Sequence, residues 1–203
     1  MATLEGKKYL VIGGTQFMGR LVVNYLVEGG ADVAVLNRGI TPSPFASNPR
    51  VRHIRCDRLN DRKQFQKIIS SGANICDAAG SKRKCESVEV QENAVPWDGV
   101  IDFVCFKAQN MKDVVNHLKT KHYIFISSDS VYMACDVERT LNSSRNSGGL
   151  LLENDVHEPR DVGMLKSRNR YQYEYGNGKL RCEKVLLESE RFRQFTILRF
   201  PDV

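Results

Sequence analysis

The feature that most constrains this chain is a glycine-rich turn between two apolar runs near its start. Residues 8–12 form the first run, and Gly13-Gly14-Thr15-Gln16-Phe17-Met18-Gly19 follows at once. A stretch with helical periodicity runs from Arg20 to Glu28, and residues 32–36 form the second apolar run. This order predicts a strand, a turn, a helix and a strand, the βαβ unit whose first turn holds a dinucleotide pyrophosphate.

Each glycine of the turn has an expected physical role. Gly13 lets the backbone leave the strand sharply, Gly14 lets the chain approach a phosphate, and Gly19 lets the helix pack close to the sheet. The start of the helix offers N–H groups and a partial positive charge to an anion. The usual spacing has a further glycine where this chain has Gln16. The alternative interpretation is a tight turn in an α/β domain that binds no nucleotide.

Apolar blocks alternate with polar ones through most of the remaining chain. They predict strands at residues 51–56, 99–106, 122–126 and 195–200. They predict helices that start after Asn60 or Asp61, at Asn110, and near Tyr171 or Tyr173. The helix after the glycine turn carries apolar residues at helical spacing: Leu21, Val22, Tyr25 and Leu26. We therefore expect an α/β fold, with a doubly wound parallel sheet in three layers.

Two segments interrupt this pattern. Residues 73–98 have no sustained period, and residues 136–168 are polar and irregular. Connections of this length are unusual in a compact α/β fold. We expect loop insertions there, within one nucleotide-binding domain that spans residues 1–203. The cluster Lys82-Arg83-Lys84 in the first segment is either a solvated charge run, the more frequent case, or a contact for nucleic acid.

Composition narrows the class of protein. The chain has 203 residues, of which 41% are apolar and 27% are charged, as in an ordinary globular protein. Its net charge of +6 suits an anionic ligand, either a phosphorylated cofactor or a nucleic acid. The six cysteines include no CxxC pair, and the four histidines lack ligand-like spacing. We expect free thiols, a reducing compartment and no metal site.

Targeting signals and membrane spans are not expected in this sequence. The first apolar run begins so close to Met1 that it leaves no room for a signal peptide. No apolar stretch is long enough to cross a bilayer. We therefore predict a cytoplasmic protein without a membrane partner.

Three polar residues are candidates for chemistry. Ser128 follows an apolar run, so it is expected at the sheet edge where ligands bind in open α/β sheets. Tyr175 and Lys179 are four residues apart and share one face of a predicted helix. A nearby ammonium favours the phenolate of a tyrosine, which can then accept a proton, while a serine hydroxyl holds the substrate oxygen. Each feature alone is common by chance, but the three together behind a glycine turn are more specific.

These motifs resemble those of the extended short-chain dehydrogenase/reductases, the NAD-dependent epimerase/dehydratase group. The matching segments are Gly13 to Gly19, Asp57 with Asp61, Ser127 to Tyr132, Tyr175 to Lys179 with Glu183, and Leu198 to Pro201. The glycine turn and the Asn37-Arg38-Gly39 segment look most like an atypical branch of the group. That branch includes bacterial epimerase-like proteins and chloroplast stem-loop RNA-binding proteins.

The resemblance implies a Rossmann fold and a role for each matching residue. Ser128, Tyr175 and Lys179 would form the catalytic triad, in which Tyr175 is the acid/base and Lys179 lowers its pKa and holds the nicotinamide ribose. Asp57, with Arg58 beside it, would meet the adenine, and Phe200 or Pro201 would border the nicotinamide.

The resemblance also bears on the choice of cofactor. Asn37 and Arg38 replace the acidic residue that binds the ribose 2′-hydroxyl in the family. An arginine at this position can pair with a 2′-phosphate. We therefore favour NADP over NAD.

The implied function is hydride transfer, as in an oxidoreductase or an isomerase such as an epimerase. The implied substrate is a nucleotide-sugar or a related carbonyl or hydroxyl compound. Members of the family carry a C-terminal region that closes over the substrate, and we expect that region to be missing from this C-terminally truncated chain. The alternatives are a non-catalytic nucleotide- or RNA-binding protein on the same fold, and an inactive truncated form. A homodimer is compatible with the fold.

Overall fold

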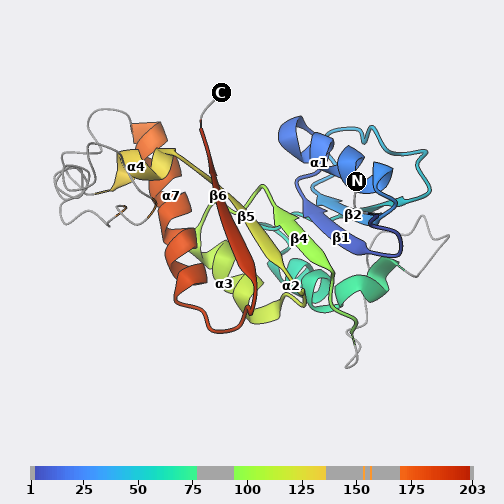
Figure 1. Cartoon of the computed structure of the whole chain (residues 1–203). Helices are drawn as coiled ribbons and strands as arrows, with labels where there is room; N and C mark the ends of the chain where they lie inside the picture. The colour runs from blue at the N-terminus through green and yellow to red at the C-terminus, as the bar shows by residue number, and fades with distance from the viewer. Residues whose placement is uncertain (1–2, 77–93, 136–152, 154–155, 157–169, 202–203) are drawn as a thin grey trace. The chain divides into compact units, whose positions relative to one another are not determined.

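A computed structural model describes residues 3–76, 94–135, 153, 156 and 170–201 of the chain (Figure 1). Strands and helices alternate along these residues. In chain order the elements are β1 (Lys8–Ile12), α1 (Phe17–Glu28), β2 (Asp32–Asn37), β3 (Val51–Arg55), α2 (Arg62–Ser70), the 3-10 helix η1 (Gly72–Cys76), β4 (Gly99–Asp102), α3 (Ala108–His117), β5 (Tyr123–Ser128), α4 (Ser130–Ala134), α7 (Arg170–Leu187) and β6 (Phe195–Phe200).

The six strands form a parallel sheet in the order β3-β2-β1-β4-β5-β6. β1 is central, with Leu10 opposite Ala34 of β2 on one side and Val100 of β4 on the other. The order of connection reverses at β1, so β1 and β4 flank the topological switch point where open α/β sheets bind ligands. This arrangement confirms the predicted doubly wound parallel sheet.

The chain packs as two compact units. The first contains residues 1–104, 112–125 and 189–196, and the second contains residues 105–111, 126–188 and 197–203. Within the first unit, α1 packs on β1 and β2, whose apolar residues are almost fully buried. Within the second unit, α4 lies against α7 (Figure 1).

The apolar residues of the first helix do not mark its buried face, whereas the predicted close packing of Gly19 is confirmed. α1 begins at Phe17, three residues before the predicted start, and its fully buried residues are Gly19 and Val23. Leu21 and Tyr25 are 56% and 69% exposed. Each lies two residues beyond a buried position, which is about 200° around the helix axis. Gly19 has no side chain to show hydrophobicity, so the apolar pattern indicated the wrong face.

Two other predicted boundaries are also wrong. β4 ends at Asp102 and not at residue 106, because the Asp102 carboxylate accepts the Val104 N–H at 3.0 Å and turns the chain. α3 begins at Ala108, so Asn110 is not its cap; the N–H groups of Asn110 and Met111 both donate to the Lys107 carbonyl.

Several other predictions are confirmed. The helix expected after Asn60 or Asp61 is α2, with Asp61 at the N-cap position but without a side-chain cap hydrogen bond, and the strand expected at residues 195–200 is β6. The last long helix is α7, which begins at Arg170 and ends at Leu187. Among the described cysteines, Cys56, Cys105, Cys135 and Cys182 are buried free thiols, as expected.

The two predicted insertions lie mostly outside the described residues, as does the Lys82-Arg83-Lys84 cluster. Of the first segment, η1 covers the beginning, and Trp97 near the end pairs with Thr120 in a parallel bridge. The Trp97 side chain is buried, so this end of the segment is part of the first unit's core.

Candidate functional site

The glycine turn is built from close backbone contacts. Gly13 leaves β1 at a φ of 91°, in the left-handed region that favours glycine, which confirms the predicted sharp exit. A Cβ on Gly19 would collide with the Gly13 carbonyl, so α1 starts directly against the turn. A Cβ on Gly14 would lie 2.9 Å from Val23 and 3.0 Å from Val11. Packing of the helix on the sheet therefore already explains Gly14, for which the sequence suggested a role in phosphate approach.

A pocket of about 460 Å³ lies beside this turn. It is lined by Thr15, Gln16, Phe17, Arg20, Thr41, Pro42, Ser43 and Pro44. The pocket contains the N-terminus of α1, where N–H groups without intrahelical acceptors and the helix dipole favour an anion. Arg20 adds a cation, and Thr15, Thr41 and Ser43 add hydroxyls, of which that of Ser43 already pairs with His53 Nε2 at 2.9 Å. This donor set suits the phosphates of a dinucleotide.

Phe17 and Arg20 show what the sequence could reveal about this pocket. Phe17 is 89% exposed and has a φ of 45°, a strained conformation for a residue other than glycine. Such strain is often found at ligand sites. Arg20 was not among the predicted cofactor residues. Its only signal in the sequence is its place directly after Gly19, in the first turn of the helix.

The segment after β2 presents Arg38 to solvent. Asn37 Oδ1 accepts the Gly39 N–H at 2.8 Å, which fixes a tight turn in which Gly39 has a φ of 70°. The Arg38 carbonyl accepts from Arg55 Nε at 3.2 Å, and the Arg38 side chain is exposed. The backbone of Arg38 is thus held in place and its guanidinium is accessible to a ligand.

Asp57 follows β3 and caps its own turn. Its Oδ1 accepts the N–H groups of Leu59 at 2.9 Å and Asn60 at 3.1 Å. The N–H of Asn60, followed by that of Leu59, holds the pKa of this carboxyl below its ordinary value. Asp57 is therefore a fixed acceptor, and its contact with an adenine amino group stays a prediction.

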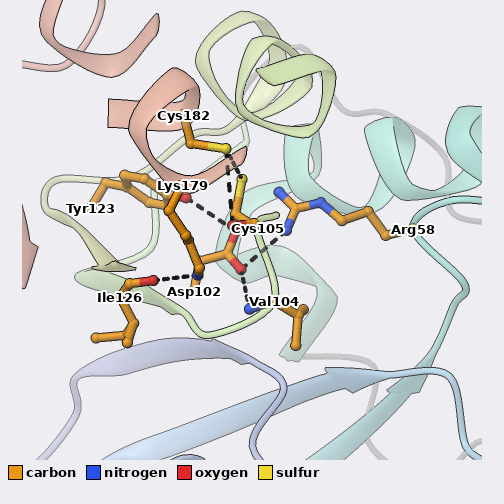
Figure 2. A network of polar contacts seen from close by, with 8 residues as sticks. All are labelled: Arg58, Asp102, Val104, Cys105, Tyr123, Ile126, Lys179 and Cys182. Atoms are coloured by element: carbon orange, nitrogen blue, oxygen red, sulfur yellow. Dashed lines mark hydrogen bonds and ion pairs between the residues drawn. The ribbon is translucent and has the colours of Figure 1, made fainter. Parts of the chain in front are cut away.

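Arg58, the next residue, is buried and paired. Its Nη1 donates to both carboxylate oxygens of Asp102, at 2.9 and 3.1 Å (Figure 2). Asp102 also accepts the Tyr123 hydroxyl at 3.0 Å. The Arg58 guanidinium carbon lies 4.6 Å from the centroid of the Phe65 ring. These contacts give Arg58 a structural role in the first unit, and a role in cofactor binding stays a prediction.

Tyr175 and Lys179 lie on α7 in the second unit, as their spacing predicts. The Lys179 ammonium is 5.9 Å from the centroid of the Tyr175 ring and donates to the Ile126 carbonyl at 2.6 Å (Figure 2). It also lies 4.7 Å from the centroid of the Phe106 ring, which is 6.0 Å from that of Tyr175. Phe106 is a residue that the sequence did not single out. Its position depends on folding around α7, which spacing along the chain does not reveal.

Two glycines let other segments approach this part of α7. A Cβ on Gly176 would collide with the Ser130 carbonyl, and a Cβ on Gly178 would collide with the Phe106 carbonyl. Glycine lowers helix propensity by about 1 kcal/mol per residue. At Gly176 and Gly178 the lower helix propensity is offset by close packing of other segments beside Tyr175 and Lys179.

Ser128 ends β5 and is buried. Its Oγ accepts the Ser130 N–H at 3.1 Å and lies 3.4 Å from Asp129 Oδ1. Because the Ser130 carbonyl abuts Gly176, the turn that carries Ser128 packs against α7 next to Tyr175. Phe200, at the end of β6, accepts the Asp129 N–H through its carbonyl at 2.9 Å, and its side chain is exposed.

An ion pair between the buried Glu183 and the partly exposed Arg199 holds these elements of the second unit together. Glu183 of α7 accepts hydrogen bonds from Ser127 Oγ at 2.5 Å and from Arg199 of β6 at 2.8 and 3.1 Å. Arg199 also donates to the Tyr132 hydroxyl at 2.9 Å. Burial disfavours the charged guanidinium, but the bonds to Glu183 outweigh burial and raise the pKa of Arg199. This network ties Ser127, the residue before Ser128, to Glu183, which lies one helical turn after Lys179 on α7.

Neither a membrane span nor a metal site is found in the described part of the chain. No helix there is both long enough and apolar enough for a membrane span. No cluster of three or more His, Cys, Asp or Glu side chains there could hold a metal ion.

Comparison with known proteins places the chain in one group. Residues 9–148 match the model of the NAD dependent epimerase/dehydratase family. A curated relative, the chloroplast stem-loop binding protein of 41 kDa b from Arabidopsis thaliana, is 26% identical over 173 residues. That alignment covers 82% of this chain and 42% of the relative, so the chain spans less than half of the relative's length.

Solved structures show the same fold. A UDP-glucose 4-epimerase superposes with a TM-score of 0.56 at 20% identity, covering 97% of this chain and 52% of that chain. The enzyme WbmG of Bordetella bronchiseptica, solved in complex with NAD, has a TM-score of 0.56 at 11% identity and covers 95% and 52%. MoeE5, in complex with UDP-glucose and NAD, has a TM-score of 0.53 at 19% identity and covers 95% and 54%.

Proposed function

The chain belongs to the NAD dependent epimerase/dehydratase family, and on this basis we propose that it binds NADP or NAD at the glycine turn. In this proposal the chain supports hydride transfer between that cofactor and a nucleotide-sugar or a related carbonyl or hydroxyl compound. The pocket at the start of α1 supports the cofactor part of the proposal, because helix N–H groups, Arg20 and three hydroxyls converge there. MoeE5, which shares this fold, was solved in complex with UDP-glucose and NAD.

The observation that carries the catalytic part is the environment of Lys179. Its side chain is 1% exposed, and its ammonium is fixed by the Ile126 carbonyl beside the Tyr175 ring. Burying a lysine is costly, and an apolar side chain would fill the same space at lower cost. A fixed ammonium next to a half-buried phenol instead suits a proton-transfer site.

Each residue then has a defined task. When bound, the nicotinamide supplies a hydride acceptor or donor. Tyr175 accepts or returns the proton of the substrate hydroxyl. Lys179 stabilises the phenolate of Tyr175 by Coulomb attraction and donates to a ribose hydroxyl. Ser128 Oγ holds the substrate oxygen, and Phe200 borders the nicotinamide.

The exposed Arg38 guanidinium favours NADP. In this proposal it pairs with the 2′-phosphate, which NADPH has and NADH lacks. Arg38→Ala is expected to weaken NADPH binding about tenfold or more and to change NADH binding less than about twofold. Fluorescence titration with both dinucleotides measures the two affinities, and Arg191→Ala, at another exposed arginine, is the matched control. An equal loss for NADPH and NADH would contradict the assignment of Arg38.

The proton-transfer role of Tyr175 predicts a separate result. Tyr175→Phe is expected to slow reduction of bound NADP⁺ by a UDP-hexose about 10²–10⁴-fold, because only the hydroxyl is removed. NADPH affinity should change less than about threefold, since the ring remains against Phe106. Absorbance at about 340 nm follows the reduction. Unchanged turnover in Tyr175→Phe would exclude this residue as the acid/base.

A second candidate function is RNA binding on the same fold. It is favoured by the similarity to the chloroplast stem-loop binding protein and by the net charge of +6. Phosphate contacts make such binding weaken steeply with added salt. A salt-dependent affinity for a stem-loop RNA, without affinity for either dinucleotide, would favour this candidate over hydride transfer.

A further inference from the structure

Two buried cysteines of the second unit face each other beside Lys179. Cys105 and Cys182 are both fully buried and outside any disulfide, and their sulfurs are 3.9 Å apart (Figure 2). The Cys182 sulfur is also 4.0 Å from the Cys105 carbonyl oxygen. A disulfide has an S–S distance of about 2.05 Å, so a small movement would allow the bond to form.

Both thiols adjoin the candidate catalytic groups. Cys105 precedes Phe106, whose ring lies 4.7 Å from the Lys179 ammonium and whose carbonyl abuts Gly178. Cys182 is three residues after Lys179, on the next turn of α7. A bond between the two sulfurs would draw the Cys105-Phe106 segment toward α7 and shift Phe106 against Lys179.

We propose that Cys105 and Cys182 form an oxidisable dithiol, and that closing its disulfide weakens dinucleotide binding. The oxidant class is a peroxide. One thiolate attacks a peroxide oxygen, the O–O bond breaks, and a sulfenic acid and water form. The second sulfur then attacks the sulfenic sulfur, the S–O bond breaks, and a second water leaves. Two thiols and one hydrogen peroxide thus give one disulfide and two waters, with two electrons passing from sulfur to oxygen.

Burial determines how the reaction proceeds. Thiols that are closed to solvent react only when the structure opens locally, so oxidation is expected to be slow. Once one thiol has become a sulfenic acid, burial shields it from solvent. The sulfur of the other cysteine is then the nearby nucleophile that closes the disulfide. Cys56 and Cys135, which are also buried, have backbone carbonyls near their sulfurs: those of Asp61 and Tyr132, respectively.

Peptide mapping of the whole chain after treatment with hydrogen peroxide tests the proposal. The expected product is a pair of peptides joined through Cys105 and Cys182. Its mass is about 2 Da below the sum of the two separate peptides, and dithiothreitol separates them again. Cys105→Ser should abolish this pair, and Cys56→Ser should keep it. Failure to find the pair in the folded wild-type chain would overturn the proposal, whether or not Cys105→Ser folds.

The effect on the cofactor rests on the proposed function and is measured separately. The oxidised chain is expected to bind NADPH about tenfold more weakly than the reduced chain, with recovery after dithiothreitol. A linked chain with unchanged NADPH affinity would refute the effect on binding. If the reduced chain binds no NADPH, the proposed function fails, while the peptide map still decides whether the disulfide forms.

Discussion

Replacing Arg58 with methionine is expected to lower the free energy of unfolding by about 3–5 kcal/mol. Arg58 is 6% exposed, and its partner Asp102 is fully buried at the end of β4. Methionine would fill much of the space over Phe65 but would leave the Asp102 carboxylate without its cation. The remaining donors are the Tyr123 hydroxyl and the Val104 N–H, which do not neutralise the charge. The Tm should fall by roughly 6–20 °C for a chain of this size.

Two comparison variants make this prediction specific. Arg170→Met removes a cation from an ion pair with Glu174 in which the side chains are 81% and 54% exposed, and it should change stability by less than about 1 kcal/mol. Adding Asp102→Asn to Arg58→Met removes the orphaned charge and should recover part of the loss. Chemical denaturation measures all three. A loss below about 1 kcal/mol in Arg58→Met would show that the buried pair is not needed for stability.

Replacing Gly19 with alanine is expected to abolish most dinucleotide binding. The added Cβ would collide with the Gly13 carbonyl and come within 3.1 Å of Gly14 Cα, so the turn or α1 must move. Overpacking of this kind costs about 1–3 kcal/mol of stability. The same movement displaces the N–H groups at the start of α1, and NADPH affinity should fall at least about tenfold.

A matched control lies on the same helix. Glu28→Ala introduces alanine at an exposed position at the other end of α1, where helix propensity favours alanine. It should leave stability and NADPH affinity nearly unchanged. Circular dichroism and the Tm establish that Gly19→Ala still folds. Full NADPH affinity in a folded Gly19→Ala chain would show that the tight contact of the turn is not required for binding.

The sequence predicted the sheet better than it predicted the helices. β1, β2 and β6 are apolar runs, and such runs in a parallel sheet mark their own limits to within about a residue or two. The orientation of α1 could not be predicted from its apolar residues. Its buried face is set by the contact of Gly19 with the turn, and glycine contributes nothing to a hydrophobic pattern.

The candidate site shows the same division between local and distant information. Tyr175 and Lys179 are one helical turn apart, so their spacing alone placed them on one face of α7. The contacts that surround them involve distant parts of the chain. Ile126 is 53 residues from Lys179 in sequence, and Arg58 is 44 residues from Asp102. No local period encodes such pairs, which therefore became visible only in the folded structure.

The proposed function depends on binding of a nicotinamide dinucleotide at the glycine turn. The most direct test is fluorescence titration of NADPH into the wild-type chain and into Gly19→Ala under the same conditions. We expect a dissociation constant on the order of 1–100 μM for the wild type and a value at least about tenfold higher for the variant. Absence of NADPH and NADH binding to the folded wild-type chain at about 1 mM would contradict it.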